Sequence, residues 1–164
     1  MTVTQNAVTS VNESIDRIIE TVKGLSEETI RWNPTEEEWS IMQIVAHIVE
    51  ALPYWVEEIE QLVQSPGQEW GRNHLHEGRL QAVSSATVDA ISVAELLQAL
   101  EEVKQKVESG IGNLTAEQLA AKAPSRNPNF GTKPLSFIID HLIDQHVNKH
   151  EGQIQRNLSK LKLN

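Results

Sequence analysis

The amino-acid sequence predicts an all-α protein, a four-helix bundle with up-down-down-up topology and one long crossover between its second and third helices. Four segments place apolar residues three and four positions apart, the spacing of an amphipathic helix. No segment sustains the two-residue alternation that would predict a strand. Residues 64–91, between the second and third segments, are too many for a turn between antiparallel neighbours, which predicts the crossover. We expect a single helical bundle domain over residues 1–164.

The first two predicted helices are defined by their apolar stripes and their ends. The first helix ends near Gly24, and its stripe comprises Val8, Val11, Ile15, Ile18, Ile19 and Val22. The second begins after Ser40, which forms a capping-box pattern with Gln43. Its stripe comprises Ile44, Ile48, Ala51, Trp55, Ile59 and Leu62. Pro53 lies inside this helix and predicts a kink.

The third predicted helix begins after Ser92, with Glu95 as its capping-box partner, and ends near Gly110. Its stripe comprises Val93, Leu96, Leu97, Leu100, Val103 and Val107. The fourth helix follows Pro134, and its inward face carries Leu135, Ile138, Ile139, Leu142, Ile143, His146, Val147, His150, Ile154 and Leu158. Residues 24–34 and 113–124 each predict a short capped turn ahead of the second and the fourth helix, a weak internal repeat.

Composition excludes several classes of partner. The chain has 14 basic and 23 acidic residues, a net charge of -9, and no basic run, so nucleic acid is not an expected partner. It has no cysteine, which leaves histidine and carboxylate as metal ligands. The N-terminus lacks a cationic start with an apolar segment, and no run reaches membrane-spanning length. We therefore expect a cytoplasmic protein with no membrane partner.

Two histidines lie four residues apart on the inward face of the fourth helix. His146 and His150 are about 40° apart around the helix axis. They are either hydrogen-bonded core residues or ligands, because neutral imidazoles at this spacing can direct a ring nitrogen at one cation. His47 lies about 60° from the centre of the second helix's stripe, facing a neighbouring helix. The sequence predicts a metal site of these three histidines with an open coordination position, as in catalytic sites.

The remaining histidines are not predicted ligands. His141 falls about 140° from His146 and about 180° from His150, so it points away from them. His74 and His76 lie in the crossover and are interpreted as solvated loop residues, although a mobile loop could bring one over the site. Because each ligand must be neutral to coordinate, we expect metal affinity to fall as the pH drops through about 6.5.

No catalytic acid or base is identified. The residue after His146 is Val147, so the glutamate of the zinc-protease pattern is missing, and Glu151 is wrongly placed to replace it. The tryptophans are interpreted as packing residues, with the lining of a pocket as the alternative: Trp55 in the core, and Trp32, Trp39 and Trp70 as anchors at helix starts and in the crossover.

Two segments, taken in order, resemble the DinB-like (YfiT-like, DinB superfamily) four-helix bundles. The segment RWNPTEEEWSIMQIVAHIVEALPYW is similar to that family's tryptophan, capped serine and metal-binding histidine on the second helix. The segment DQHVNKHEGQIQRNL is similar to its closing histidine pair followed by Gly-Gln-Ile. The resemblance covers essentially the whole chain. It implies that His47, His146 and His150 bind a divalent metal ion, nickel or zinc, and that the protein is a homodimer; Pro53 in the second helix also suggests unpaired apolar surface.

The resemblance implies more than one function. Some members resemble transferases or isomerases that use a low-molecular-weight thiol such as bacillithiol or mycothiol, others resemble metal-dependent hydrolases, and many have no known activity. We expect a metal-dependent S-transferase or hydrolase with a small-molecule substrate, in which the cation activates a thiol or water. The alternative is a non-enzymatic helical bundle that binds a metal or a small ligand, with a stress-related role.

Overall fold

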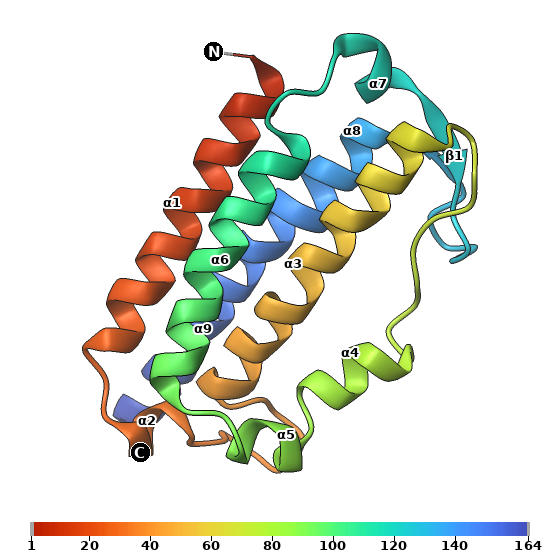
Figure 1. Cartoon of the computed structure of the whole chain (residues 1–164). Helices are drawn as coiled ribbons and strands as arrows, with labels where there is room; N and C mark the ends of the chain where they lie inside the picture. The colour runs from red at the N-terminus through yellow and green to blue at the C-terminus, as the bar shows by residue number, and fades with distance from the viewer. Residues whose placement is uncertain (1, 164) are drawn as a thin grey trace.

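The structure, a computed structural model, describes residues 2–163. Three of the four long helices are α1, α3 and α6 (Figure 1), with bounds Val3–Lys23, Ile41–Gln64 and Val93–Ile111. The fourth is one continuous rod of three segments, α8 (Leu135–Phe137), the π-helix η1 (Ile138–Asp144) and α9 (Gln145–Leu163). The predicted four-helix bundle is therefore confirmed.

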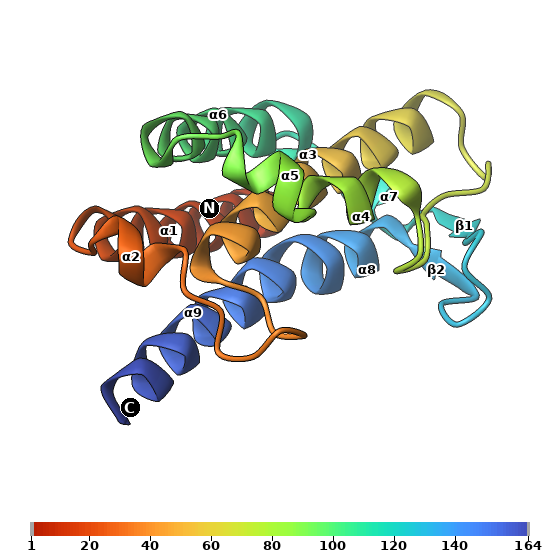
Figure 2. The same ribbon diagram turned by 90° about the horizontal axis from the view of Figure 1, so that it is seen from below.

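The direction of the four long helices is also as predicted. In Figure 1, α1 and the rod that ends in α9 run down the page, whereas α3 and α6 run up it. The parallel pair α3 and α6 needs a connection that returns along the bundle, and this crossover contains α4 (Glu77–Ala82) and α5 (Ser85–Asp89). Both α1 and α3 pack against α6 and against α9, so the core lies at the centre of a square of helices (Figure 2).

Local signals set the ends of the helices. Ser40 Oγ accepts a hydrogen bond from the backbone N–H of Gln43 (3.1 Å), and Gln43 Oε1 accepts one from the backbone N–H of Ser40 (2.9 Å), the predicted capping box. Ser92 Oγ accepts from the Glu95 N–H (3.1 Å), the first bond of the box predicted there. The predicted capped turns are α2 (Glu27–Ile30) and α7 (Ala116–Ala120). Ahead of α2 and α7, side chains again supply the capping bonds.

Two residues that are usually helix breakers lie inside helices. Pro53 lies within α3, which continues without interruption to Gln64. Gly110 is the residue before the end of α6 at Ile111, so the third helix ends near Gly110 as predicted. A Cβ at Gly110 would lie 2.2 Å from Cγ1 of Val56 in α3, so the glycine allows the two helices to pack closely.

The apolar surface expected near Pro53 is not found. The exposed large hydrophobic residues within the described part of the chain are Val3, Leu75 and Leu80, and none of them lies in α3. The homodimer therefore stays a prediction that rests on the family resemblance. None of the helices in residues 2–163 is both long enough and apolar enough to cross a membrane.

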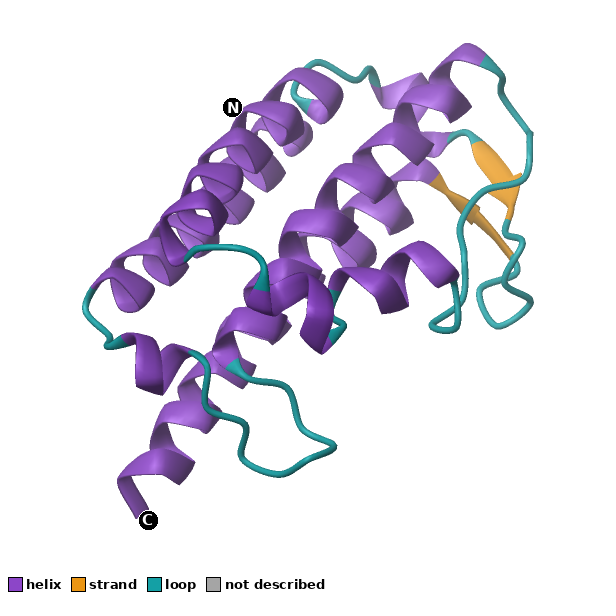
Figure 3. Cartoon of the chain, turned by 60° about the horizontal axis from the view of Figure 1, so that its bottom comes forward, coloured by secondary structure: helices purple, strands orange, loops and turns teal. Residues whose placement is uncertain are grey.

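A small β-hairpin lies at one end of the bundle and was not predicted (Figure 3). Its antiparallel strands are β1 (Lys122–Pro124) and β2 (Thr132–Pro134). Each strand has three residues, too few to produce a recognisable alternation. The crossover is attached to this hairpin through Trp70, whose indole N–H donates to the carbonyl of Ala123 (2.8 Å). The hairpin thus helps to hold the start of the crossover beside α3.

Candidate metal centre

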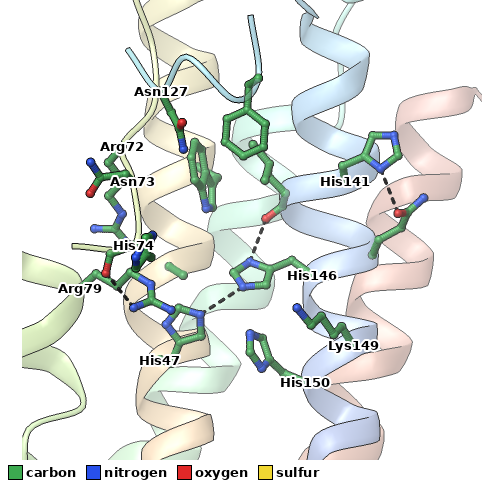
Figure 4. A pocket seen from close by; sticks show the side chains of 15 residues that line it. His47, Arg72, Asn73, His74, Arg79, Asn127, His141, His146, Lys149 and His150 are labelled. Carbon is green, nitrogen blue, oxygen red and sulfur yellow. Dashed lines mark hydrogen bonds between the residues drawn. The ribbon is translucent and has the colours of Figure 1, made fainter. Parts of the chain in front are cut away.

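Three histidine rings meet between α3 and α9 (Figure 4). His47 lies in the second turn of α3, and His146 and His150 lie one turn apart on α9. The Nε2 atoms of His47 and His146 are 3.1 Å apart, and one nitrogen from each of the three rings lies within 4.8 Å of the others. The structure therefore brings together all three residues that the sequence singled out.

The outer nitrogens of two rings are already hydrogen-bonded. Nδ1 of His146 lies 3.1 Å from the carbonyl oxygen of Leu142, and Nδ1 of His150 lies 2.8 Å from Oε1 of Gln153. Both partners are acceptors, so each Nδ1 carries the proton and each Nε2 carries a lone pair, which in His146 faces the Nε2 of His47 in a hydrogen bond. Metal-binding histidines are usually oriented by such a second hydrogen bond. These contacts prepare the two Nε2 atoms to be ligands.

The third ring, His47, has one ring nitrogen without a hydrogen-bond partner. It is 2% exposed, and its Nδ1 is buried without a hydrogen-bond partner in the described structure. Trp39 covers it, with ring centroids 5.1 Å apart, and also stacks on His150 at 6.3 Å. Buried polar atoms are rarely left unpaired. The unpaired Nδ1 of His47 favours a ligand group over a set of ordinary core histidines, the alternative that the sequence left open.

The spacing of the nitrogens fits a small divalent cation. Two nitrogens that each lie about 2.0–2.1 Å from a tetrahedral zinc ion are about 3.3 Å apart. The Nε2 atoms of His47 and His146, 3.1 Å apart, come close to that spacing. Among residues 2–163, no fourth potential protein ligand joins the three histidines. The arrangement can hold one divalent cation and leave a position open.

Burial keeps the three rings in the neutral form that binds metal. It lowers the pKa of His47 to about 2, with a further contribution from His146 and His150. Burial and the nearby His150 lower the pKa of His146 to about 4, and burial also lowers that of His150. The expected fall in metal affinity at about pH 6.5 applies to exposed imidazoles, and burial shifts it. The fall is expected at lower pH.

Comparison with known proteins places the fold. The family model of the DinB superfamily matches residues 11–154. The chain belongs to the DinB superfamily. Among solved structures it is similar to YfiT from Bacillus subtilis, described as a probable metal-dependent hydrolase with an unusual four-helix bundle topology. The TM-score is 0.82 at 11% identity, over 99% of this chain and 90% of YfiT.

A second similar structure is a conserved protein from Enterococcus faecalis, with a TM-score of 0.73 at 17% identity. The match covers 100% of this chain and 99% of that one. At such identities the two structures establish the fold alone. No curated protein matches the sequence.

In this DinB-superfamily protein the triad faces a cavity of about 540 Å³. The wall opposite the fourth helix comes from α3, from the crossover and from the hairpin loop (Figure 4). Trp55 lines this cavity, and Trp39 contacts two of the histidines, so two tryptophans are also pocket residues. Trp70 is fully buried and is a packing anchor, as predicted.

The other histidines lie outside the ligand cluster. His141 and His74 line the cavity, but both are exposed. His141 forms a 2.9 Å hydrogen bond between its Nδ1 and Oε1 of Gln145. Its predicted angle assumed an α-helix, whereas His141 lies in η1, where the wider π turn changes the spacing. His76 accepts a hydrogen bond from the Gly78 N–H at the start of α4 (3.2 Å).

Two acidic residues of α3, the buried Glu58 and the partly buried Glu50, hold the crossover over the site. Glu58 accepts hydrogen bonds from the Tyr54 hydroxyl (2.7 Å), the Gly71 backbone N–H (3.0 Å) and the Arg126 guanidinium (3.1 Å). Burial and the bond to Glu58 raise the pKa of Tyr54. About two helical turns earlier, Glu50 accepts a hydrogen bond from the Arg72 guanidinium (2.7 Å). Sequence reasoning missed these contacts because most of their partners are distant in the chain.

Proposed function

We propose that this DinB-superfamily protein is a metal-dependent S-transferase that acts on a low-molecular-weight thiol, with nickel or zinc held by His47, His146 and His150. One observation carries the proposal: three neutral imidazoles converge, without a fourth protein ligand among the described residues, at the wall of a 540 Å³ cavity. Structural zinc sites are usually closed by four protein ligands, whereas catalytic sites keep a position open.

The roles of the protein groups follow from their contacts. When bound, a divalent cation supplies a Lewis acid that lowers the pKa of a thiol at the open position. Leu142 O and Gln153 fix the rings of His146 and His150, and Trp39 excludes water from one side of the triad. A thiol held there would lose its proton to solvent, its sulfur would form the bond to the electrophile, and the leaving group would depart with its electron pair.

The lining of the cavity favours a thiol over water as the nucleophile. No aspartate or glutamate is among the residues, all within the described part of the chain, that line it. A thiol has a pKa of about 8.5 and needs little further help to ionise, whereas water must lose a much less acidic proton. A hydrolase is the second candidate, because the fold is similar to that of YfiT, a probable metal-dependent hydrolase.

Turnover by protein with and without metal tests the proposal. Nickel-loaded or zinc-loaded protein is mixed with bacillithiol, mycothiol or another small thiol and an aryl halide, and loss of free thiol is followed. We expect faster loss than with the metal-free protein, because the cation is what stabilises the thiolate. An activated ester without thiol tests the hydrolase. Equal rates with and without metal in both assays would contradict the proposal and leave the non-enzymatic binding protein in the lead.

A further inference from the structure

The cavity beside the histidines has a charge opposite to that of the whole chain. The protein has a net charge of -9 and 23 acidic residues, yet the described residues that line this cavity include no carboxylate. They include three permanent cations, Arg72, Arg79 and Lys149. A neighbouring cavity of about 450 Å³, which Glu37 and Glu38 also line, shares Arg79, Lys149 and His150. The positive charge is therefore concentrated where the two cavities meet.

Only one of the three cations is neutralised by the protein. Arg72 forms an ion pair with Glu50 and is 8% exposed. Arg79 and Lys149 form no ion pair with a carboxylate within residues 2–163. The Arg79 guanidinium donates to the carbonyl of His74 (3.0 Å) and lies 5.7 Å from the Trp39 ring centroid, leaving most of its N–H groups available.

Electrostatics at Arg79 agree with this picture. Burial, followed by the charge of Arg72, lowers the pKa of Arg79, and Glu50 opposes the shift. Glu50 is already paired with Arg72, so Arg79 lies in a positive environment that its own protein does not balance. Placing an anion beside it would relieve that repulsion.

The two unpaired cations flank the triad. Arg79 extends from α4 beside His47, and Lys149 extends from α9, on which it lies between His146 and His150 (Figure 4). A small molecule whose reacting group points at the three imidazoles therefore lies within reach of side chains from both elements. The guanidinium can bind a carboxylate or phosphate through two parallel hydrogen bonds, and the lysine adds a point charge.

We infer that Arg79 and Lys149 form an anion subsite, and that the substrate carries a carboxylate or phosphate group that binds there while its reacting group points at the histidines. The identity of the reacting group rests on the proposed function. The subsite itself does not, because both of its cations belong to the chain and are charged without a metal.

Titration calorimetry with succinate and with inorganic phosphate tests the subsite. The protein is metal-free, dialysed free of chelator, and kept at neutral pH and low salt. We expect saturable binding of at least one anion, weakened about tenfold by Arg79→Gln and by Lys149→Gln, about the worth of one charge-assisted hydrogen bond. The matched control is Lys162→Gln, which removes the same charge from an exposed position on α9 outside both cavities and should leave affinity within about twofold.

The outcomes separate the alternatives. Tighter succinate binding assigns a carboxylate, and tighter phosphate binding assigns a phosphate. No saturable binding of either anion, or an equal loss in the Lys162→Gln control, overturns the inference. Lys149 is exposed, so its variant remains informative even if Arg79→Gln fails to fold. Metal content is measured in parallel: protein that binds metal but no anion contradicts only the subsite, and protein that binds anion but no metal contradicts only the proposed function.

Discussion

The contact between α1 and α6 and the contact between α3 and α9 are built from similar amphipathic helices but are filled differently. The first buries aliphatic side chains, among them Ile15 and Leu100, both fully buried. The second also holds three imidazoles, two buried and one partly buried, and one of the buried rings keeps an unpaired nitrogen. Burial of apolar area stabilises a fold, whereas burial of an unpaired polar atom costs free energy. The α1–α6 contact therefore supplies stability, and the α3–α9 contact gives some of it up to hold the three imidazoles together.

The largest loss of stability is expected from a substitution in the aliphatic α1–α6 contact. Leu100→Ala should lower the free energy of unfolding by about 3–5 kcal/mol, because it removes a fully buried side chain and leaves a cavity. Urea denaturation measures the change. Metal bound per folded molecule should stay the same. A variant that is as stable as wild type, or that loses metal while folded, would show that the two contacts are not separable.

The histidines in the α3–α9 contact should make the stability of the metal-free protein depend on pH. The unfolded chain takes up a proton on His146 near the ordinary pKa of 6.5, whereas the folded protein resists it until about 4. The contribution of His146 to the free energy of unfolding is therefore fully present above pH 6.5, and it is lost as the pH is lowered towards 4. Between about pH 6.5 and 5, replacing His146 by Gln should remove about 2 kcal/mol of that fall. An unchanged slope in urea titrations would contradict the pKa assignment.

A smaller effect is expected where α3 holds the crossover. Glu58→Ala should cost about 1–3 kcal/mol, because it leaves the buried Gly71 N–H without its acceptor while Tyr54 and Arg126 can reach water. The matched control is Glu69→Ala, at an exposed acidic residue near the start of the crossover, which should change stability by less than about 0.5 kcal/mol. Equal effects of the two variants in thermal or urea unfolding would refute the role of Glu58.

The parts that could be predicted from the sequence depend on local rules. Helical periodicity and capping pairs such as Ser40 and Gln43 act over a few residues, so they located the four helices. The pairing of His146 with His150 was predictable for the same reason, since both lie in regular α-helix. His47 could be predicted as the third ligand because the apolar stripe of its helix showed that it faces a neighbouring helix.

The parts that could not be predicted depend on contacts between distant segments. The sequence located the helix end near Gly110, but not the close approach of Val56 from another helix. Arg79 lines the cavity because the crossover is held on α3 by contacts such as the ion pair of Arg72 with Glu50. The π-helix before His146 has no signal in the apolar spacing, and it altered the position of His141.

The central claim is that His47, His146 and His150 hold one divalent cation together, and metal content measures this most directly. Purified protein is supplemented with nickel or zinc, freed of excess and analysed for bound metal, with circular dichroism on the same samples. We predict one ion per chain in wild type and in the His141→Ala control, and strong loss in each single alanine variant of the triad with the helical signal retained. Wild-type protein without metal, or a triple alanine variant that binds as much as wild type, would contradict the account.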